Sequence, residues 1–154
     1  MQLSDQRDIK AAPAVVWAAI LDRDVLQAAV PGCESMTGSA ADGFEAVVVQ
    51  KVGPVKARFS GKVTLDQTDA PGGFSLKGEG SGGVAGFAKG GAVVTLEDRG
   101  TETLLRYEAS ADVGGKIAQL GSRLIAGTAK KLADQFFTTF AAEVTKAEQP
   151  SGTA

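Results

Sequence analysis

The stretch "VGGKIAQLGSRLIAGTAKKLADQFFTTF", residues 113–140, decides the fold. At 100° per residue, its apolar side chains form one stripe that drifts slowly around a helix, because nearly all steps between them are four residues. The stripe consists of Ile117, Leu120, Leu124, Thr128, Leu132, Phe136 and Phe140. A drifting stripe suits a long helix that lies across a twisted, curved sheet, and we predict such a helix here.

Two glycines stand in the middle of this predicted helix. Each costs roughly 1 kcal/mol relative to alanine in a helix interior. Gly121 falls within the apolar face, so the missing side chain either leaves room beneath the helix or lets the helix pack closely on a strand. Gly127 falls on the flank of the stripe, where we expect a bend.

The segment that precedes the helix, residues 33–113, alternates apolar and polar side chains with the period of a β-strand. The alternation is clearest in "VKARFSGKVTLD", residues 55–66, where one face is apolar and the other polar. Turn signals at 53–54, 71–73 and 99–100 separate the runs. The pattern predicts an antiparallel meander of about six strands.

The N-terminal part adds one strand and two short helices. Residues 3–9 fit a first strand, and Pro13 stands where helices prefer to begin. Asp22 or Asp24 allows a break before a second short helix, which ends at 31–32.

These elements predict an α+β fold in one domain, residues 1–146, with a flexible polar tail at 147–154. A curved antiparallel sheet of about seven strands is expected to wrap around the long C-terminal helix. A strongly curved sheet and a straight helix do not close tightly together, so we expect a cavity between them.

Composition excludes several function classes. Sixteen Lys and Arg against eighteen Asp and Glu give a net charge of −2, which argues against a nucleic-acid partner. Cys33 is the only cysteine, so an internal disulfide is impossible. The N-terminus lacks the order of a signal peptide, and no apolar run approaches the roughly 20 residues of a membrane span. We therefore expect a cytoplasmic protein.

Side chains that carry catalysis are scarce. The chain has no histidine, which removes the commonest general base, nucleophile activator and metal ligand. A lone cysteine without histidine is typical of a buried small hydrophobe rather than of a nucleophile. Glu79, Glu97 and Glu108 fall on the outward phase of their strands, where solvated surface is expected. We predict no catalytic residue, no metal and no cofactor.

Two surface features remain open. The glycine-rich run at 78–92 lacks a phosphate-binding pattern, and we expect a mobile hairpin loop with Phe87 at or near its tip. Phe87 then acts as a gate, contacts a membrane together with Lys89, or simply packs. The basic ridge consists of Lys116, Arg123 and Lys130, with Lys131 nearby. It is either a solvated face or a docking surface for anionic groups.

Four motifs in this order resemble the carbon monoxide dehydrogenase CoxG family, within the START and birch-pollen-allergen-like helix-grip (SRPBCC) superfamily. They are "VPGCESM", "VGPVKARFSGKV", "GEGSGGVAGFAKGGA" and "VGGKIAQLGSRLIAGTAKKLADQFF", and the resemblance covers residues 1–145. It implies a sheet wrapped around the C-terminal helix with an internal apolar cavity.

The resemblance also implies a function. Members of this family resemble accessory proteins of molybdenum-containing carbon monoxide dehydrogenases and related hydroxylases, with membrane recruitment or carriage of a quinone as their suggested roles. We therefore expect a non-enzymatic protein that binds a lipophilic molecule, with transient contact at the inner membrane face. The alternatives are an assembly or membrane-docking factor with an incidental cavity, and an enzyme of the cyclase or hydratase type.

The expected ligand-binding residues come from the inward phase of the strands and from the apolar face of the helix, with one addition from the glycine-rich run. Tyr107 is the only polar residue among them, and its hydroxyl would bond either a ligand carbonyl or a backbone partner. The set is Val48, Phe59, Val63, Phe74, Leu76, Phe87, Val94, Leu105, Tyr107, Leu120, Gly121, Leu124 and Ile125.

Overall fold

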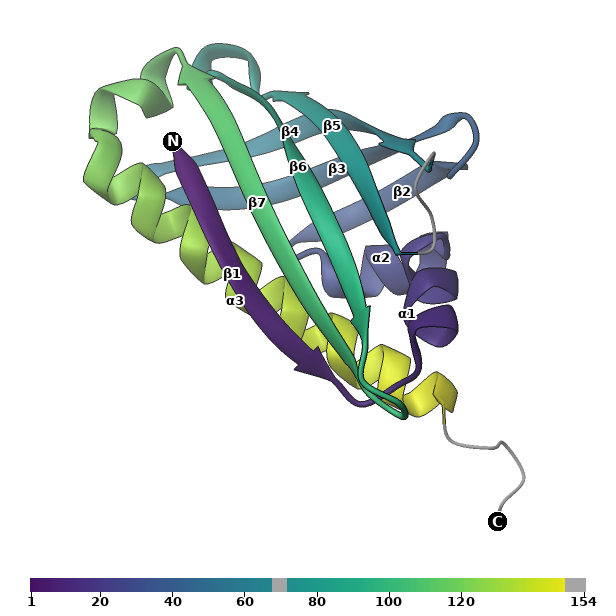
Figure 1. Ribbon diagram of the computed structural model, residues 1–154. Coiled ribbons are helices and arrows are strands. Elements are labelled where there is room, and N and C mark those ends of the chain that lie inside the picture. Colours follow the sequence, from purple (N-terminus) through teal and green to yellow (C-terminus); the bar gives the residue numbers. More distant parts are fainter. Residues whose placement is uncertain (68–71, 149–154) are drawn as a thin grey trace.

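A seven-stranded antiparallel sheet curves around one long helix in the computed structural model, which describes residues 1–67 and 72–148 (Figure 1). The strand order is β1-β7-β6-β5-β4-β3-β2. The strands are β1 (Gln2–Ile9), β2 (Cys33–Ser39), β3 (Gly43–Val52), β4 (Val55–Asp66), β5 (Gly73–Ser81), β6 (Phe87–Asp98) and β7 (Thr103–Gly114). The helices are α1 (Pro13–Ile20), α2 (Arg23–Ala29) and α3 (Ser122–Glu148), with short 3₁₀ segments η1 (Gly83–Ala85) and η2 (Lys116–Leu120).

The helix starts follow from local chemistry. Pro13 is the first residue of α1, where its missing N–H costs nothing. Asp22 separates α1 from α2 and caps α2, because its side chain accepts hydrogen bonds from the backbone N–H groups of Asp24 (2.9 Å) and Val25 (3.4 Å). These features confirm the predicted pair of short helices. The predicted turn at 71–73 lies partly outside the described residues, as does most of the predicted tail.

The long helix is shorter than its sequence pattern suggested. Residues 116–120 form η2, and α3 begins only at Ser122. Gly121 lies between the two segments with φ 96° and ψ 151°, and its carbonyl accepts the first hydrogen bond of α3, from the N–H of Ile125 at 3.2 Å. The prediction that Gly121 lies inside the helix is therefore wrong, because the chain turns there through a backbone conformation open essentially only to glycine.

The core lies between the sheet and the C-terminal half of α3. Its most buried large side chains include Phe140, Ile9, Leu105 and Val144. Thr103 is fully buried at the start of β7, and its hydroxyl donates a 2.7 Å hydrogen bond to the carbonyl of Ala11. This bond joins β7 to the turn between β1 and α1, so the core end of the sheet is firmly connected.

Candidate functional site

An apolar cavity of about 240 Å³ lies between the inner face of the sheet, α2 and the C-terminal half of α3. Its lining contains hydrocarbon side chains and one thioether, and it includes no charged or hydrogen-bonding side chain. The lining consists of Ile20, Leu26, Val30, Met36, Phe44, Ala46, Val63, Leu65, Phe74, Leu76, Val94, Leu105, Phe136, Phe137 and Phe140.

Strand register explains why these side chains converge. Residues directly opposite each other in neighbouring strands point to the same face of a sheet. Phe44 lies opposite Val63, Leu65 opposite Leu76, and Phe74 opposite Val94. The sheet therefore presents a continuous apolar patch to α3.

Five of the thirteen predicted ligand-binding residues line this cavity, and all thirteen are described by the structure. The five are Val63, Phe74, Leu76, Val94 and Leu105. The helix residues that do line it, including Phe136 and Phe137, come from the C-terminal half of α3 rather than from 120–125. Phe136 and Phe140 belong to the apolar stripe, so the stripe identified the face correctly but not the half of the helix that covers the cavity.

The residues predicted at 120–125 lie elsewhere. Leu120 and Leu124 face the β3–β4 turn, where a Cβ built on Gly53 would lie 2.8 Å from Leu124 Cδ2 and 3.7 Å from Leu120 Cδ1. Gly121 is exposed and a Cβ there would meet no atom within 4 Å among the described residues. Ile125 is half-buried outside the lining. Gly121 therefore makes no room for a ligand in this cavity.

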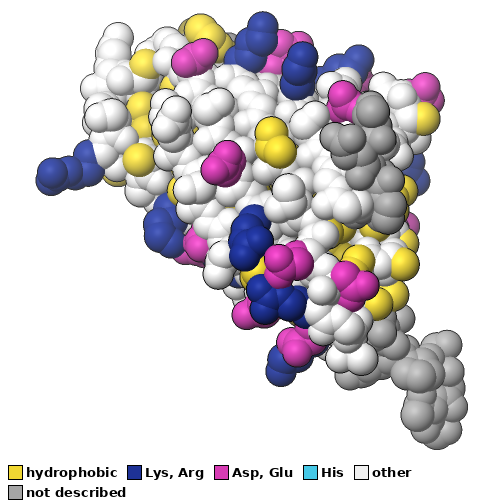
Figure 2. Space-filling view, in the orientation of Figure 1, with side chains coloured by type: hydrophobic (Ala, Val, Ile, Leu, Met, Phe, Trp, Pro, Cys, Tyr) yellow, Lys and Arg dark blue, Asp and Glu magenta, His cyan; other side chains and the backbone are white. Residues whose placement is uncertain are grey.

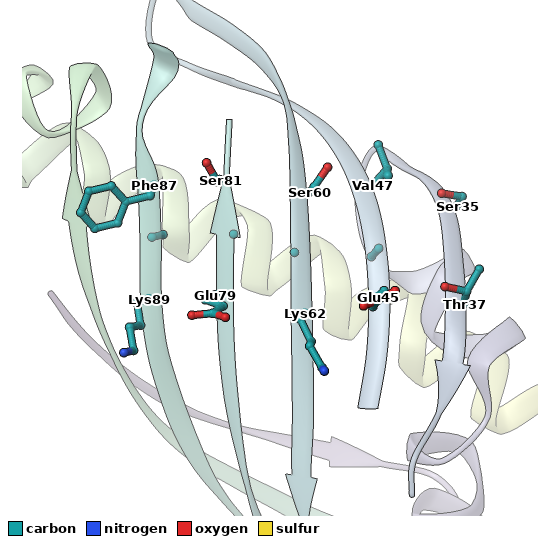
Figure 3. A pocket seen from close by; sticks show the side chains of 14 residues that line it. Ser35, Thr37, Glu45, Val47, Ser60, Lys62, Glu79, Ser81, Phe87 and Lys89 are labelled. Carbon is teal, nitrogen blue, oxygen red and sulfur yellow. The ribbon is translucent and has the colours of Figure 1, made fainter. Parts of the chain in front are cut away.

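Three further predicted residues also lie outside the lining. Val48 and Phe59 lie opposite each other on β3 and β4, both half-buried. Phe87 is not at a loop tip: it is the first residue of β6, and its ring lies against Gly114 of β7. The tip is formed by η1, where Val84 is 93% exposed. Phe87 shares the phase of Lys89, which places it on the outer face of the sheet (Figure 3).

Tyr107 borders the cavity region without lining it. Its ring stacks on that of Phe137 at 5.1 Å between centroids and 18° between planes. The Cζ atom of Arg7 lies 5.7 Å from the centroid of the same Phe137 ring. Phe137 thus has the cavity on one side and a polar cluster on the other.

That polar cluster joins β1 to α3. Arg7 forms an ion pair with Asp5 at 2.7 Å and a second with Asp134, and Lys130 reaches Asp134 at 3.0 Å. The hydrogen bond from Arg7 lowers the pKa of Asp5, while burial raises the pKa of Tyr107. Lys130 of the predicted basic ridge is therefore engaged in an ion pair.

A larger, open depression lies on the opposite face of the sheet, with α3 behind it (Figure 3). Glu45, Lys62, Glu79, Lys89 and Asp112 lie next to one another in register across β3 to β7, so their charges alternate in sign. Opposite charges in such cross-strand positions stabilise a sheet by roughly 0.2–1 kcal/mol per pair. Figure 2 likewise shows acidic and basic side chains interspersed over the surface. We interpret the outer face as solvated surface.

Cys33 is half-buried, and its thiol donates a 3.2 Å hydrogen bond to the carbonyl of Ser35. Burial raises the pKa of this thiol, so it stays protonated at neutral pH. Across residues 1–67 and 72–148, no group of three or more His, Cys, Asp or Glu side chains could hold a metal ion. None of the helices in these ranges is both long and apolar enough to cross a membrane.

Comparison with known proteins extends these observations. The family described as carbon monoxide dehydrogenase CoxG matches residues 6–145. A search of curated proteins found no match. A conserved protein from Geobacillus kaustophilus has a similar structure, with a TM-score of 0.88, 27% sequence identity, and coverage of 97% of this chain and 98% of that one.

More distant solved structures show the same fold. A START superfamily protein from Mycobacterium smegmatis aligns with a TM-score of 0.71 and 12% identity, over 95% of this chain and 98% of the other. The Zhui aromatase/cyclase from Streptomyces sp. R1128 aligns with a TM-score of 0.66 and 13% identity, over 100% and 99% of the two chains. At these identities the likeness concerns the fold alone.

Proposed function

The chain belongs to the carbon monoxide dehydrogenase CoxG family, and from this premise we propose that it is a non-enzymatic accessory protein that binds a lipophilic ligand. It has the helix-grip fold of START-like proteins. The proposed binding site is the apolar cavity between the sheet, α2 and α3. The proposed partner is a molybdenum-containing carbon monoxide dehydrogenase or a related hydroxylase in the cytoplasm, and the proposed ligand is a quinone-like molecule.

The apolar lining of the cavity is the observation that supports this proposal. Transfer of apolar surface from water into such a site contributes roughly 25 cal/mol per Å². None of its lining side chains can transfer a proton or act as a nucleophile, which favours binding over catalysis. A cyclase-type enzyme, the alternative suggested by one structural neighbour, would need such groups at the ligand.

Two neighbouring valines of β6 offer a matched test. Val94 is buried and lines the cavity, whereas Val93 points to the outer face and is 57% exposed. Val94→Phe would fill part of the cavity, and Val93→Phe adds the same ring outside it. We expect the first to weaken binding of the neutral fluorescent probe N-phenyl-1-naphthylamine at least tenfold, and the second to leave binding unchanged.

The natural ligand is accessible by the same pair. Solvent extraction of the purified parent followed by mass spectrometry should yield a lipophilic molecule that is depleted in Val94→Phe and retained in Val93→Phe. If neither the parent nor Val93→Phe binds the probe or yields a ligand, the proposed function is wrong.

Docking at a membrane is a second candidate function, favoured by the exposed tip of the β5–β6 connection. Val84 is 93% exposed there, and Phe87 and Lys89 follow at the start of β6. A basic residue near an anionic bilayer contributes roughly 1 kcal/mol, so such contact would be weak and sensitive to salt. Val84→Ser should reduce co-sedimentation with phosphatidylserine vesicles at low salt, whereas Val93→Ser should not. A parent that never sediments would exclude direct contact.

A further inference from the structure

Tyr107 is a largely buried residue whose hydroxyl has no protein partner among the described residues. The residue is 7% exposed, and its hydroxyl forms no hydrogen bond within 1–67 and 72–148. Buried tyrosines usually find a hydrogen-bond partner. Within the same ranges, no fully enclosed side-chain nitrogen or oxygen lacks a partner. The Tyr107 hydroxyl must therefore border open space rather than packed protein.

The groups around this hydroxyl are balanced in charge. Asp5, Arg7, Asp134 and Lys130 all lie close enough to influence the pKa of Tyr107, and they supply two negative and two positive charges. Burial raises that pKa, so the hydroxyl is protonated at neutral pH and available as a donor. A ligand carboxylate would add an uncompensated negative charge here, whereas a neutral acceptor oxygen would add none.

The cavity alone is too small and too apolar for a complete functionalised ligand. Its volume of about 240 Å³ lies below the roughly 300–1,000 Å³ of ordinary small-molecule sites. It holds about eight methylene-sized groups if each takes the roughly 30 Å³ of a water molecule. A carbonyl placed inside would lose its hydrogen bonds to water without replacement, which costs about 2–7 kcal/mol. The polar part of a ligand must lie elsewhere.

One ring separates the two places. Phe137 lines the cavity and stacks on Tyr107 at 5.1 Å between centroids. We infer that the cavity holds the hydrocarbon part of the ligand, and that the Tyr107 hydroxyl donates a hydrogen bond to a neutral acceptor oxygen in its head group. This inference rests on the proposed function, and it makes the ligand a molecule with an unfunctionalised hydrocarbon portion and a carbonyl-type head.

Chain-matched probes test this assignment. The dissociation constants of decane, 2-decanone and decanoate are measured by displacement of N-phenyl-1-naphthylamine from the full chain, for the parent and for Tyr107→Phe. The substitution removes the hydroxyl but keeps the ring stacked on Phe137, and no hydrogen bond to a described residue is lost. We expect it to weaken 2-decanone binding about two- to tenfold, the range for one neutral hydrogen bond, and to leave decane binding unchanged.

A second measurement does not depend on affinity. The infrared carbonyl stretch of bound 2-decanone should lie at lower frequency in the parent than in Tyr107→Phe, because a hydrogen bond weakens the C=O bond. Equal 2-decanone binding and equal frequencies in the two proteins would overturn the head-group assignment while decane binding still supports the proposed function. Tighter binding of decanoate than of 2-decanone would overturn the choice of a neutral head. If the parent binds none of the three probes, the proposed function itself fails.

Discussion

Gly121 and Gly127 should respond to alanine with opposite signs, although both lie within the stretch that decides the fold. A Cβ at either position would meet no atom within 4 Å among the described residues, so packing contributes little to the difference. Gly127 lies inside α3, where glycine costs about 0.5–1 kcal/mol relative to alanine. Gly121 has φ 96° and ψ 151°, where a residue with a side chain pays on the order of 1–3 kcal/mol.

These values convert into measurable temperature shifts. A domain of 154 residues changes its melting temperature by about 3 °C per kcal/mol. We expect Gly127→Ala to raise the melting temperature by about 2–3 °C and Gly121→Ala to lower it by about 3–9 °C. Scanning calorimetry of the parent and both variants at one pH and one protein concentration would measure these shifts. Probe binding should be the same in all three proteins, because neither glycine lines the cavity.

A rise in melting temperature for Gly121→Ala would refute this reasoning. It would mean that the helix continues through residue 121 and that η2 is an extension of α3. Loss of probe binding in a folded Gly121→Ala protein would instead restore the idea that this glycine makes room for a ligand.

Three further substitutions test the core and the polar cluster. Thr103→Val keeps the shape but leaves the buried carbonyl of Ala11 without its donor, so thermal melts should show a loss of about 1–3 kcal/mol; an unchanged melt would mean that water replaces the hydroxyl. Phe140→Ala removes a ring that is 1% exposed, and urea unfolding should show a loss of about 3–5 kcal/mol, together with weaker probe binding. Burial raises the pKa of Tyr107 above its ordinary value of 10.0, so its contribution to stability is present below that pH and is lost as pH rises through the folded-state pKa. Tyr107→Phe should therefore flatten the decline of melting temperature above about pH 10, and an unchanged alkaline limb would contradict the shift.

Local patterns predicted most of the fold. The alternation over residues 55–66 coincides with β4, and Pro13 begins α1 as its backbone chemistry suggests. Gly121 defeated the pattern because Ile117 and Leu120 keep nearly the same spacing in a 3₁₀ segment as in an α-helix. Periodicity alone could not distinguish the two.

The outer position of Phe87 was readable from the sequence. Counting back by two from inward-facing Val94 reaches Ala88, which leaves Phe87 on the outward phase with Lys89. The part of α3 that covers the cavity was not readable, because it depends on where α2 packs against α3. Sequence periodicity gives the face of a helix that is buried but not its position along the sheet.

Paired aromatic rings explain how a cavity persists beside a close-packed core. On α3, Phe136 meets Phe137 edge to face at 5.1 Å and stacks on Phe140 at 5.5 Å, while Phe137 stacks on Tyr107 of β7. Each pair contributes about 0.5–1.5 kcal/mol beyond its buried area, so rings that moved inward to fill the cavity would break contacts that now hold them in place. The wall is therefore formed before a ligand arrives. Little reorganisation then opposes binding, and the free energy gained by burying a hydrocarbon chain goes largely into affinity.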